Sequence, residues 1–142
     1  MRLMPSDPDV KTIISRVFDG DINLQPDFQR GEVWGGSKKI RLIDSILREW
    51  HVPPIHVIEI KETGRQEVLD GQQRLVAIRD FIRNEIRIDG NIEPIDKSIQ
   101  EIHGKTYSEL PDYWRRKFDK FTIRVYNITD YQPSEPGELF YR

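Results

Sequence analysis

The chain has 142 residues, and its 22 basic and 24 acidic side chains leave a net charge of −2, which excludes the strongly basic balance of a dedicated nucleic-acid-binding domain. The chain is 37% hydrophobic and 32% charged. Its sequence has no apolar run that approaches the roughly 20 residues of a membrane span. The absence of cysteine excludes disulfides, thiolate chemistry and cysteine-ligated zinc, and with no visible signal peptide we expect a cytoplasmic protein with one domain over residues 1–142.

Two helices are expected in the first third of the chain. Apolar residues recur at helical spacing between Ser6, the predicted cap, and Gly20, which ends the first helix. The second helix is predicted from its cap, Ser37, to Trp50, where a double proline follows. Residues 26–36 between them are expected to form an ordered loop.

A hairpin, two more helices and a last strand are expected in the remainder. Residues 55–60 and 66–69 are rich in β-forming side chains and flank a glycine turn, which predicts a hairpin. A helix is predicted over about residues 74–84 and a shorter one over 112–119. Alternating apolar and polar residues predict a strand over 121–128. Between the two helices, short extended pieces are expected over residues 85–95, and residues 96–111 are expected to be irregular.

The densest polar motif is Asp70-Gly71-Gln72-Gln73-Arg74, which lies where the predicted hairpin passes into a helix. A glycine turn at a helix N-terminus directs backbone N–H groups at a bound anion, and the helix dipole favours negative charge there. Arg74 could grip a phosphate with two hydrogen bonds, and Asp70 could hold Mg²⁺ or orient a water. Gln72 and Gln73 could bond a base, a sugar or the attacking water. In the structural alternative, Asp70 caps the helix and Arg74 pairs with a carboxylate.

A second glutamine and arginine set lies in the predicted loop, at Gln25, Gln29 and Arg30. Loops fixed by aromatic side chains often present polar groups to ligands. Two such sets in a small chain suggest two guanidinium groups, those of Arg30 and Arg74, directed at one anion. The alternative is that Arg30 is a surface arginine that stacks on Trp34 or Phe28.

Two alternative functions come from other patterns. The cations Arg115, Arg116, Lys117 and Lys120 form a cluster, which is either an ordinary solvated face or the contact surface of a non-enzymatic module that binds DNA or protein.

Asp27, Glu59 and Lys61 resemble a metal-dependent nuclease signature, which would make the chain a DNA nuclease in its own right. Residues 31–38 nearly match a P-loop, but no strand leads into them. The histidines show no metal-ligand spacing and are expected to be ordinary surface or core residues: His51, His56 and His103.

The order of several motifs along residues 10–142 resembles the GmrS-type domain. That domain belongs to the ParB/sulfiredoxin-like superfamily and is found in modification-dependent restriction and phage-defence proteins. The motifs that carry the resemblance are Gln25-x-x-x-Gln29-Arg30, Val33-Trp34, Ile43-Asp44-Ser45-Ile46-Leu47, Pro53-Pro54-Ile55 and Asp70-Gly71-Gln72-Gln73-Arg74-Leu75.

The resemblance implies an α/β fold, with a small mixed sheet and flanking helices, and a nucleotide site. The Gly71-x-x-Arg74 spacing is similar to the phosphate-contacting turn of ParB and sulfiredoxin, so Gly71, Arg74, Gln25, Gln29 and Arg30 would bind GTP, ATP or CTP with Mg²⁺. The catalytic residues in that site would be Asp70, Gln72 and Gln73.

The resemblance also implies partners. Nucleotide turnover would control DNA cleavage by an HNH-type nuclease domain or subunit, which is expected elsewhere because this chain has no His-Asn-His constellation. DNA would be bound through the full-length protein, and a homo-oligomer is compatible with this arrangement. Residues 139–142 resemble the start of the family's Phe-x-Arg-Leu-Asn segment, so the domain is expected to continue beyond them.

Overall fold

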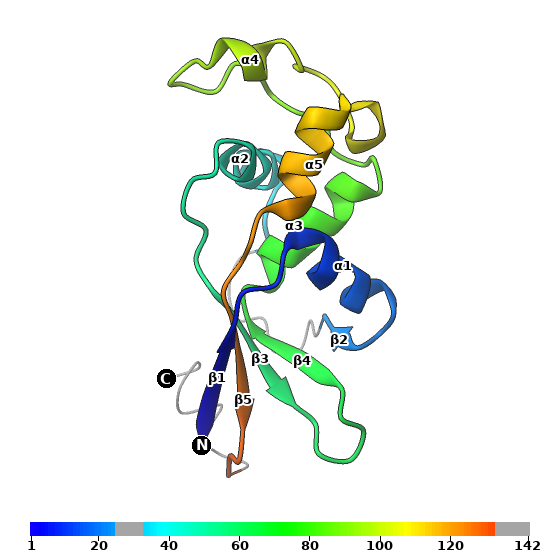
Figure 1. The fold of residues 1–142 in the computed structure, drawn as a ribbon, viewed down its shortest axis with the longest axis vertical. Helices are drawn as coiled ribbons and strands as arrows, with labels where there is room; N and C mark the ends of the chain where they lie inside the picture. Colours follow the sequence, from blue (N-terminus) through cyan, green and yellow to red (C-terminus); the bar gives the residue numbers. More distant parts are fainter. Residues whose placement is uncertain (25–32, 133–142) are drawn as a thin grey trace. The chain divides into compact units, whose positions relative to one another are not determined.

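The computed structural model describes residues 1–24 and 33–132 (Figure 1). Its chain divides into two units. The first unit comprises Met1–Glu32, Pro53–Gln72 and Thr122–Arg142, and the second comprises Val33–Val52 and Gln73–Phe121. The second unit is therefore contributed by two segments that interrupt the first. The expectation of one domain over residues 1–142 stays a prediction.

The first unit is built on a five-stranded mixed sheet with the order β1-β5-β3-β4-β2. Strand β3 is central, and it pairs parallel with β5 and antiparallel with β4. The edge strand β1 is antiparallel to β5, and the short β2 is parallel to β4. The predicted α/β class with a mixed sheet is confirmed. The strands are β1 (Arg2–Ser6), β2 (Ile22–Asn23), β3 (Ile55–Glu59), β4 (Gln66–Asp70) and β5 (Val125–Thr129).

Alternating side chains of these strands bury apolar surface. Ile58, Leu69 and Ile128 form one buried cluster, against which Ile60 and Tyr131 pack. Val57 and Val68, which neighbour them in sequence, are also fully buried, as expected where successive residues of a strand point to opposite faces. Both faces of the central strands therefore contribute to the core.

Helix α1 (Val10–Phe18) belongs to the first unit and begins later than predicted. Its cap is Asp9, whose carboxylate accepts a hydrogen bond of 2.8 Å from the backbone N–H of Thr12. The prediction that Ser6 is the cap is wrong, because Ser6 ends β1 and is paired with Val125 of β5. The apolar face of α1 is buried at Val10, Ile13 and Ile14.

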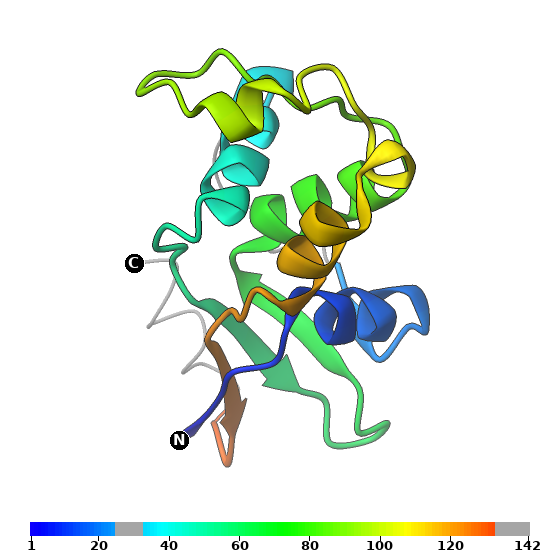
Figure 2. The same cartoon turned by 45° about the horizontal axis from the view of Figure 1, so that its top comes forward.

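The second unit is helical. Helix α3 starts with the last residue of the first unit and continues through the second. Phe81 of α3, Phe118 of α5 and Tyr107 pack edge to face, with ring centroids 5.0 to 6.0 Å apart. Figure 2 shows α2, α3 and α5 as neighbouring coils in cyan, green and orange. The helices are α2 (Gly36–Leu47), α3 (Gln72–Ile82), α4 (Lys97–Gln100), the 3-10 turn η2 (Tyr107–Glu109) and α5 (Asp112–Lys120).

Several predicted boundaries differ from the structure. Helix α2 is capped by Gly35 without a side-chain hydrogen bond, so the prediction of Ser37 as its cap is wrong. Helix α3 begins at Gln72, two residues before the predicted start near Arg74. The segment expected to be irregular contains α4, because the Asp96 carboxylate caps it, and η2, because Thr106 and Glu109 form a capping box.

A buried carboxylate joins α2 to α3 within the second unit. Nζ of Lys39 lies 2.9 Å from Oδ2 of Asp80, and the guanidinium of Arg79 donates to Oδ1 at 3.2 and 3.3 Å. Burial raises the pKa of Asp80, but the hydrogen bonds from Lys39 and Arg79 outweigh it and leave the pKa below its usual value. The ionised form of Asp80 is therefore the one that stabilises the fold.

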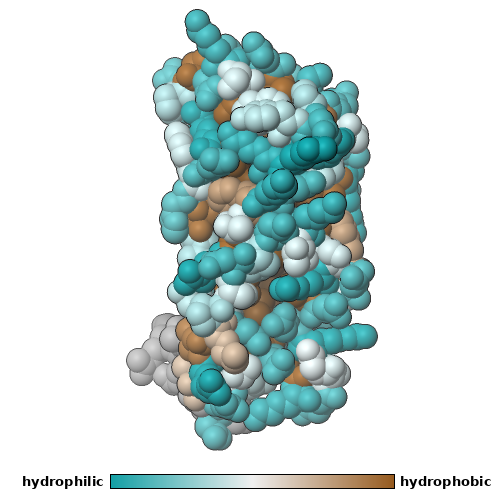
Figure 3. Space-filling view, viewed as in Figure 1, coloured by the Kyte–Doolittle hydropathy of each residue, from teal (hydrophilic) through white to brown (hydrophobic). Residues whose placement is uncertain are grey.

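The surface of the described residues is predominantly hydrophilic on the face drawn in Figure 3, where hydrophobic side chains occur in small, separate patches. None of the helices in the described segments is long and apolar enough to span a membrane.

We predict that Asp80→Asn lowers the free energy of unfolding at pH 7 by about 1–3 kcal/mol, because it leaves Lys39 and Arg79 without the carboxylate that they pair with. A lowered folded-state pKa means that this stabilisation is complete above pH 3.8 and is lost as the pH falls through the folded-state pKa. Urea denaturation of wild type and variant should therefore converge in strong acid. Asp112→Asn instead removes the exposed ion pairs of Asp112 with Arg115 and Arg116 and should change stability by less than about 1 kcal/mol. An equal effect of the two substitutions would contradict this assignment.

Candidate functional site

The 70–74 motif lies at the junction of a strand and a helix, as predicted. Strand β4 ends at Asp70, Gly71 has a φ of 96°, and α3 begins at Gln72. This positive φ is one that glycine adopts readily and other residues rarely do. The first backbone N–H groups of a helix have no partner within the helix itself, and this holds for those of Gln72 and Gln73 in the first turn of α3.

The two glutamines have different environments. Gln72 is only 5% exposed, and its side-chain oxygen accepts no hydrogen bond within the described segments. Gln73 is half-buried, and its side-chain oxygen accepts a hydrogen bond of 3.2 Å from the backbone N–H of Trp34. Gln73 therefore fixes the residues before α2. Buried polar atoms usually have a hydrogen-bond partner, and the side-chain oxygen of Gln72 has none among the described residues. This favours Gln72 as a residue that accepts a hydrogen bond from a ligand.

His56 faces the motif from the neighbouring strand. Its Nδ1 lies 3.3 Å from Oδ2 of Asp70, and its ring stacks on Tyr126 with centroids 5.2 Å apart at 22°. The Asp70 side chain is 50% exposed and that of His56 is mostly buried. An imidazole beside a carboxylate is a pair that enzymes use in general acid–base chemistry.

Sequence reasoning set His56 aside as an ordinary residue, because it shows no metal-ligand spacing. The signal that could have found it is the hairpin register, since β3 and β4 were both predicted. His56 pairs with Asp70 across that hairpin, where the register shifts next to Val57. Assigning the register requires the position of this irregularity, which the sequence does not specify.

The Asp70 carboxylate could be one ligand of a metal ion that takes its other ligands from nucleotide and water. No group of three or more histidine, aspartate or glutamate side chains in residues 1–24 and 33–132 could enclose a metal ion. Mg²⁺ in nucleotide sites commonly uses one or two carboxylates, with phosphates and water completing the shell. The single carboxylate of Asp70 fits that donor set.

Other predicted site residues lie elsewhere or outside the described part. Gln25, Asp27, Gln29 and Arg30 fall in residues 25–32, outside the described residues, as do residues 31 and 32 of the near P-loop. Of the predicted nuclease set, Glu59 ends β3, and Nζ of Lys61 lies 5.6 Å above the ring of Tyr131.

The basic cluster on α5 does not form a uniform cationic face. Arg115 and Arg116 both pair with Asp112, at 3.1 Å for Arg116. Lys117 instead lies over aromatic rings of its own helix, and Lys120 is exposed at the helix end. Two of the four cations, Arg115 and Arg116, are thus partly neutralised.

The family of the GmrSD restriction endonuclease N-terminal domain matches residues 10–142. The chain belongs to this family. Comparison with curated proteins and with solved structures gave no match. The GmrSD family confirms the resemblance carried by the motif order, and it supports a role in restriction and phage defence. The relation to ParB and sulfiredoxin, nucleotide hydrolysis and the site residues stay predictions.

We predict that Gly71→Ala lowers the free energy of unfolding by about 1–2 kcal/mol, because a side chain at this positive φ is strained. The matched control is Gly36→Ala, which adds a methyl group in open space at the start of α2 and should leave stability unchanged or slightly raised. Urea denaturation followed by circular dichroism measures both. A Gly71→Ala variant as stable as the control would show that the turn relaxes without cost.

Proposed function

We propose that the chain is a nucleoside-triphosphate-binding and -hydrolysing regulatory domain of a DNA-targeting restriction protein, with its nucleotide site at residues 70–74. The observation that supports this most is the convergence of a positive-φ glycine turn, a buried glutamine oxygen without a partner and an imidazole–carboxylate pair. The GmrSD family supports the restriction context, and the nucleotide chemistry is the proposal.

Phosphate binding would use the backbone first. The Gly71 turn would let the backbone approach a ligand closely, and the first turn of α3 with the helix dipole would attract an anion. Arg74 lies in that same turn and would add a guanidinium that grips two phosphate oxygens. Gln25, Gln29 and Arg30 remain predicted contacts of the same nucleotide.

Hydrolysis would use the groups around Asp70. Mg²⁺, when bound, supplies charge neutralisation at the phosphates. The Asp70 carboxylate would hold this ion or orient the attacking water, and His56 would hold a proton beside it. Gln72 would accept a hydrogen bond from that water through its side-chain oxygen. Positioning and charge neutralisation are most of what phosphoryl transfer requires of a protein.

DNA cleavage itself would belong to another part of the system. The sequence contains no His-Asn-His constellation, so we assign the cutting step to an HNH-type nuclease domain or subunit. Nucleotide turnover at residues 70–74 would then control when that nuclease acts. In this arrangement the chain alone binds and hydrolyses nucleotide without nicking DNA.

We predict that Arg74→Ala weakens nucleotide binding at least tenfold, because a hydrogen-bonded guanidinium on a phosphate contributes about 1.5–3 kcal/mol. Calorimetric titration with GTP, ATP and CTP in the presence of Mg²⁺ measures this. The matched control is Arg83→Ala, an exposed arginine just beyond the other end of α3, which should bind like wild type. Unchanged affinity in a folded Arg74→Ala variant would refute the site.

We predict that His56→Phe slows nucleotide hydrolysis, measured as inorganic phosphate formed, at least tenfold and leaves nucleotide affinity within about twofold. The reason is that general acid–base groups typically accelerate a reaction about 10²–10⁴-fold. Phenylalanine retains an aromatic ring to stack on Tyr126 but removes Nδ1. The control is His51→Phe at an exposed position, which should hydrolyse at the wild-type rate. Equal rates in both variants would leave His56 without a catalytic role.

A further inference from the structure

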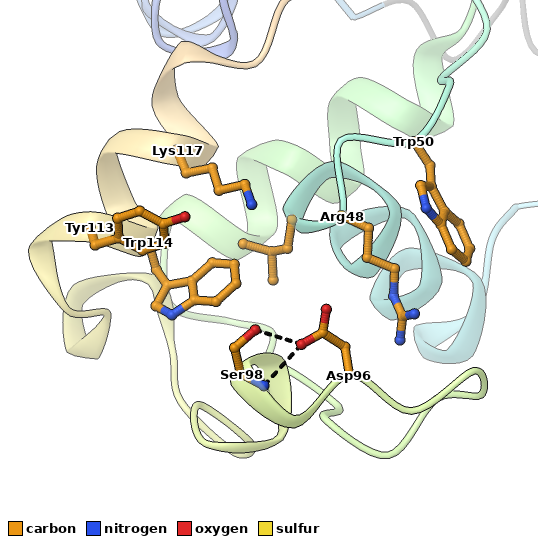
Figure 4. Close-up of a pocket in the computed structure, with 8 residues that line it drawn as sticks. Arg48, Trp50, Asp96, Ser98, Tyr113, Trp114 and Lys117 are labelled. Carbon is orange, nitrogen blue, oxygen red and sulfur yellow. Dashed lines mark hydrogen bonds between the residues drawn. The ribbon is translucent and has the colours of Figure 1, made fainter.

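A pocket of about 490 Å³ lies wholly within the second unit. It is lined by side chains from the end of α2 and the residues after it, from the start of α4, and from α5 (Figure 4). Its volume falls within the range of about 300–1,000 Å³ that is typical of small-ligand sites. None of its lining residues belongs to the 70–74 motif.

One wall of the pocket is held by Arg48, which follows α2. Its guanidinium donates to the carbonyl oxygens of Ile92 and Pro94, at 2.9 and 2.6 Å, and its Nε lies 2.9 Å from the buried carboxylate of Asp44. These contacts fix the chain that leads to Asp96. The charge of Arg48 is already engaged, so Arg48 builds the wall and another cation must serve a ligand.

Aromatic side chains supply the apolar lining. Trp114 is 8% exposed and forms an inner surface, whereas Tyr113 is 67% exposed and Trp50 is 48% exposed. Tyr113 and Trp114 meet edge to face at 5.4 Å. Large exposed aromatic rings beside a pocket are the usual platform for stacking a planar ligand ring.

Two polar groups of opposite charge complete the lining. One oxygen of Asp96 accepts hydrogen bonds from the N–H and hydroxyl of Ser98 and the N–H of Ile99, and Figure 4 shows the other oxygen pointing into the pocket. The hydrogen bonds from Ser98 and Ile99 hold the pKa of Asp96 below its usual value, so it is an acceptor at neutral pH.

Lys117 supplies the positive charge. Its ammonium lies 5.0 Å from the ring centre of Trp114, and in Figure 4 it points towards the space above Asp96. Within residues 33–132 we find no ion pair of Lys117, whereas Arg115 and Arg116 of the same helix both pair with Asp112.

We propose that this pocket binds a single unstacked nucleobase that carries an exocyclic amine, together with its phosphate. The ring would stack on Tyr113, the amine would donate to the second oxygen of Asp96, and the phosphate would lie on Lys117. Carboxylates accept from the amine of cytosine, and flipped bases are read by edge hydrogen bonds combined with stacking. A purely aliphatic ligand would bury Asp96 and Lys117 unpaired, and an inorganic anion would face the Asp96 carboxylate.

The base could come from a DNA strand or from a free nucleotide, and the two sources share this chemistry. The proposal for this pocket does not depend on the proposed nucleotide site at residues 70–74, because the pocket uses other residues and requires no triphosphate. If the pocket binds no base, the proposed hydrolase function is unaffected. If Arg74→Ala leaves nucleotide affinity unchanged, the proposal for the pocket is unaffected.

Fluorescence anisotropy with labelled 12-mers of dC and dT tests the pocket on the full chain, with unlabelled dCMP as competitor. We expect dC to bind more tightly than dT, which has a carbonyl in place of the amine. Tyr113→Ala and Lys117→Gln should each weaken dC binding at least fivefold, as expected from about 1–3 kcal/mol per stacked base. Asp96→Asn keeps a capping side chain and should abolish the preference for dC over dT.

Lys120→Gln is the matched control, since it removes an exposed charge from the same helix outside the pocket, and it should weaken binding less than twofold. If dCMP displaces the oligonucleotide at an equal concentration of bases, the natural ligand is a free nucleotide. If dCMP does not displace it, the natural ligand is a base within a DNA strand. The proposal is overturned if dC does not bind, if Lys120→Gln weakens dC binding as much as Lys117→Gln, or if folded Tyr113→Ala binds dC like wild type.

Discussion

The pairing of β3 along both of its edges is the constraint on which the first unit depends. Its backbone is hydrogen-bonded antiparallel to β4 and parallel to β5, so two strands far apart in sequence are set in register against it. His56 is opposite Asp70 on one side and opposite Tyr126 on the other. The imidazole, the carboxylate and the stacking ring therefore meet because of strand register, which requires no dedicated loop. This register also explains why a polar cluster can lie beside a buried apolar sheet.

The second unit depends on charges held away from solvent. Asp80 joins α2 to α3 through Lys39, and Arg48 binds the carbonyl groups of the segment before α4. Burial raises the pKa of Asp44, and the ion pair with Arg48 opposes this rise. Buried ionic groups are costly unless their remaining hydrogen bonds are satisfied, so these links specify one arrangement of helices more than they add stability. The pocket beside Arg48 is a product of that specification.

Local sequence signals predicted the elements better than their ends or their contacts. Apolar periodicity located the main helices, and the glycine turn placed the 70–74 motif correctly because both signals involve neighbouring residues. The helix caps predicted at Ser6 and Ser37 were wrong. Ser6 lies in β1 and pairs with β5, and α2 begins before Ser37, with Gly35 as its N-cap. Strand β1 was not predicted, because all five of its residues are exposed and carry no burial pattern. The His56 pair and the pocket depend on register and tertiary packing, which composition and spacing do not encode.

Strand β1 has a practical consequence for how the domain is delimited. The family match begins at residue 10, whereas β1 spans Arg2–Ser6 and covers one edge of β5. A protein trimmed to the matched residues would keep every family motif and lose this strand. The uncovered edge of β5 would then present unpaired N–H and C=O groups, which other strands can join. Recombinant production of residues 10–142 alone is therefore expected to favour self-association through the sheet, even though no residue of the proposed nucleotide site has been removed.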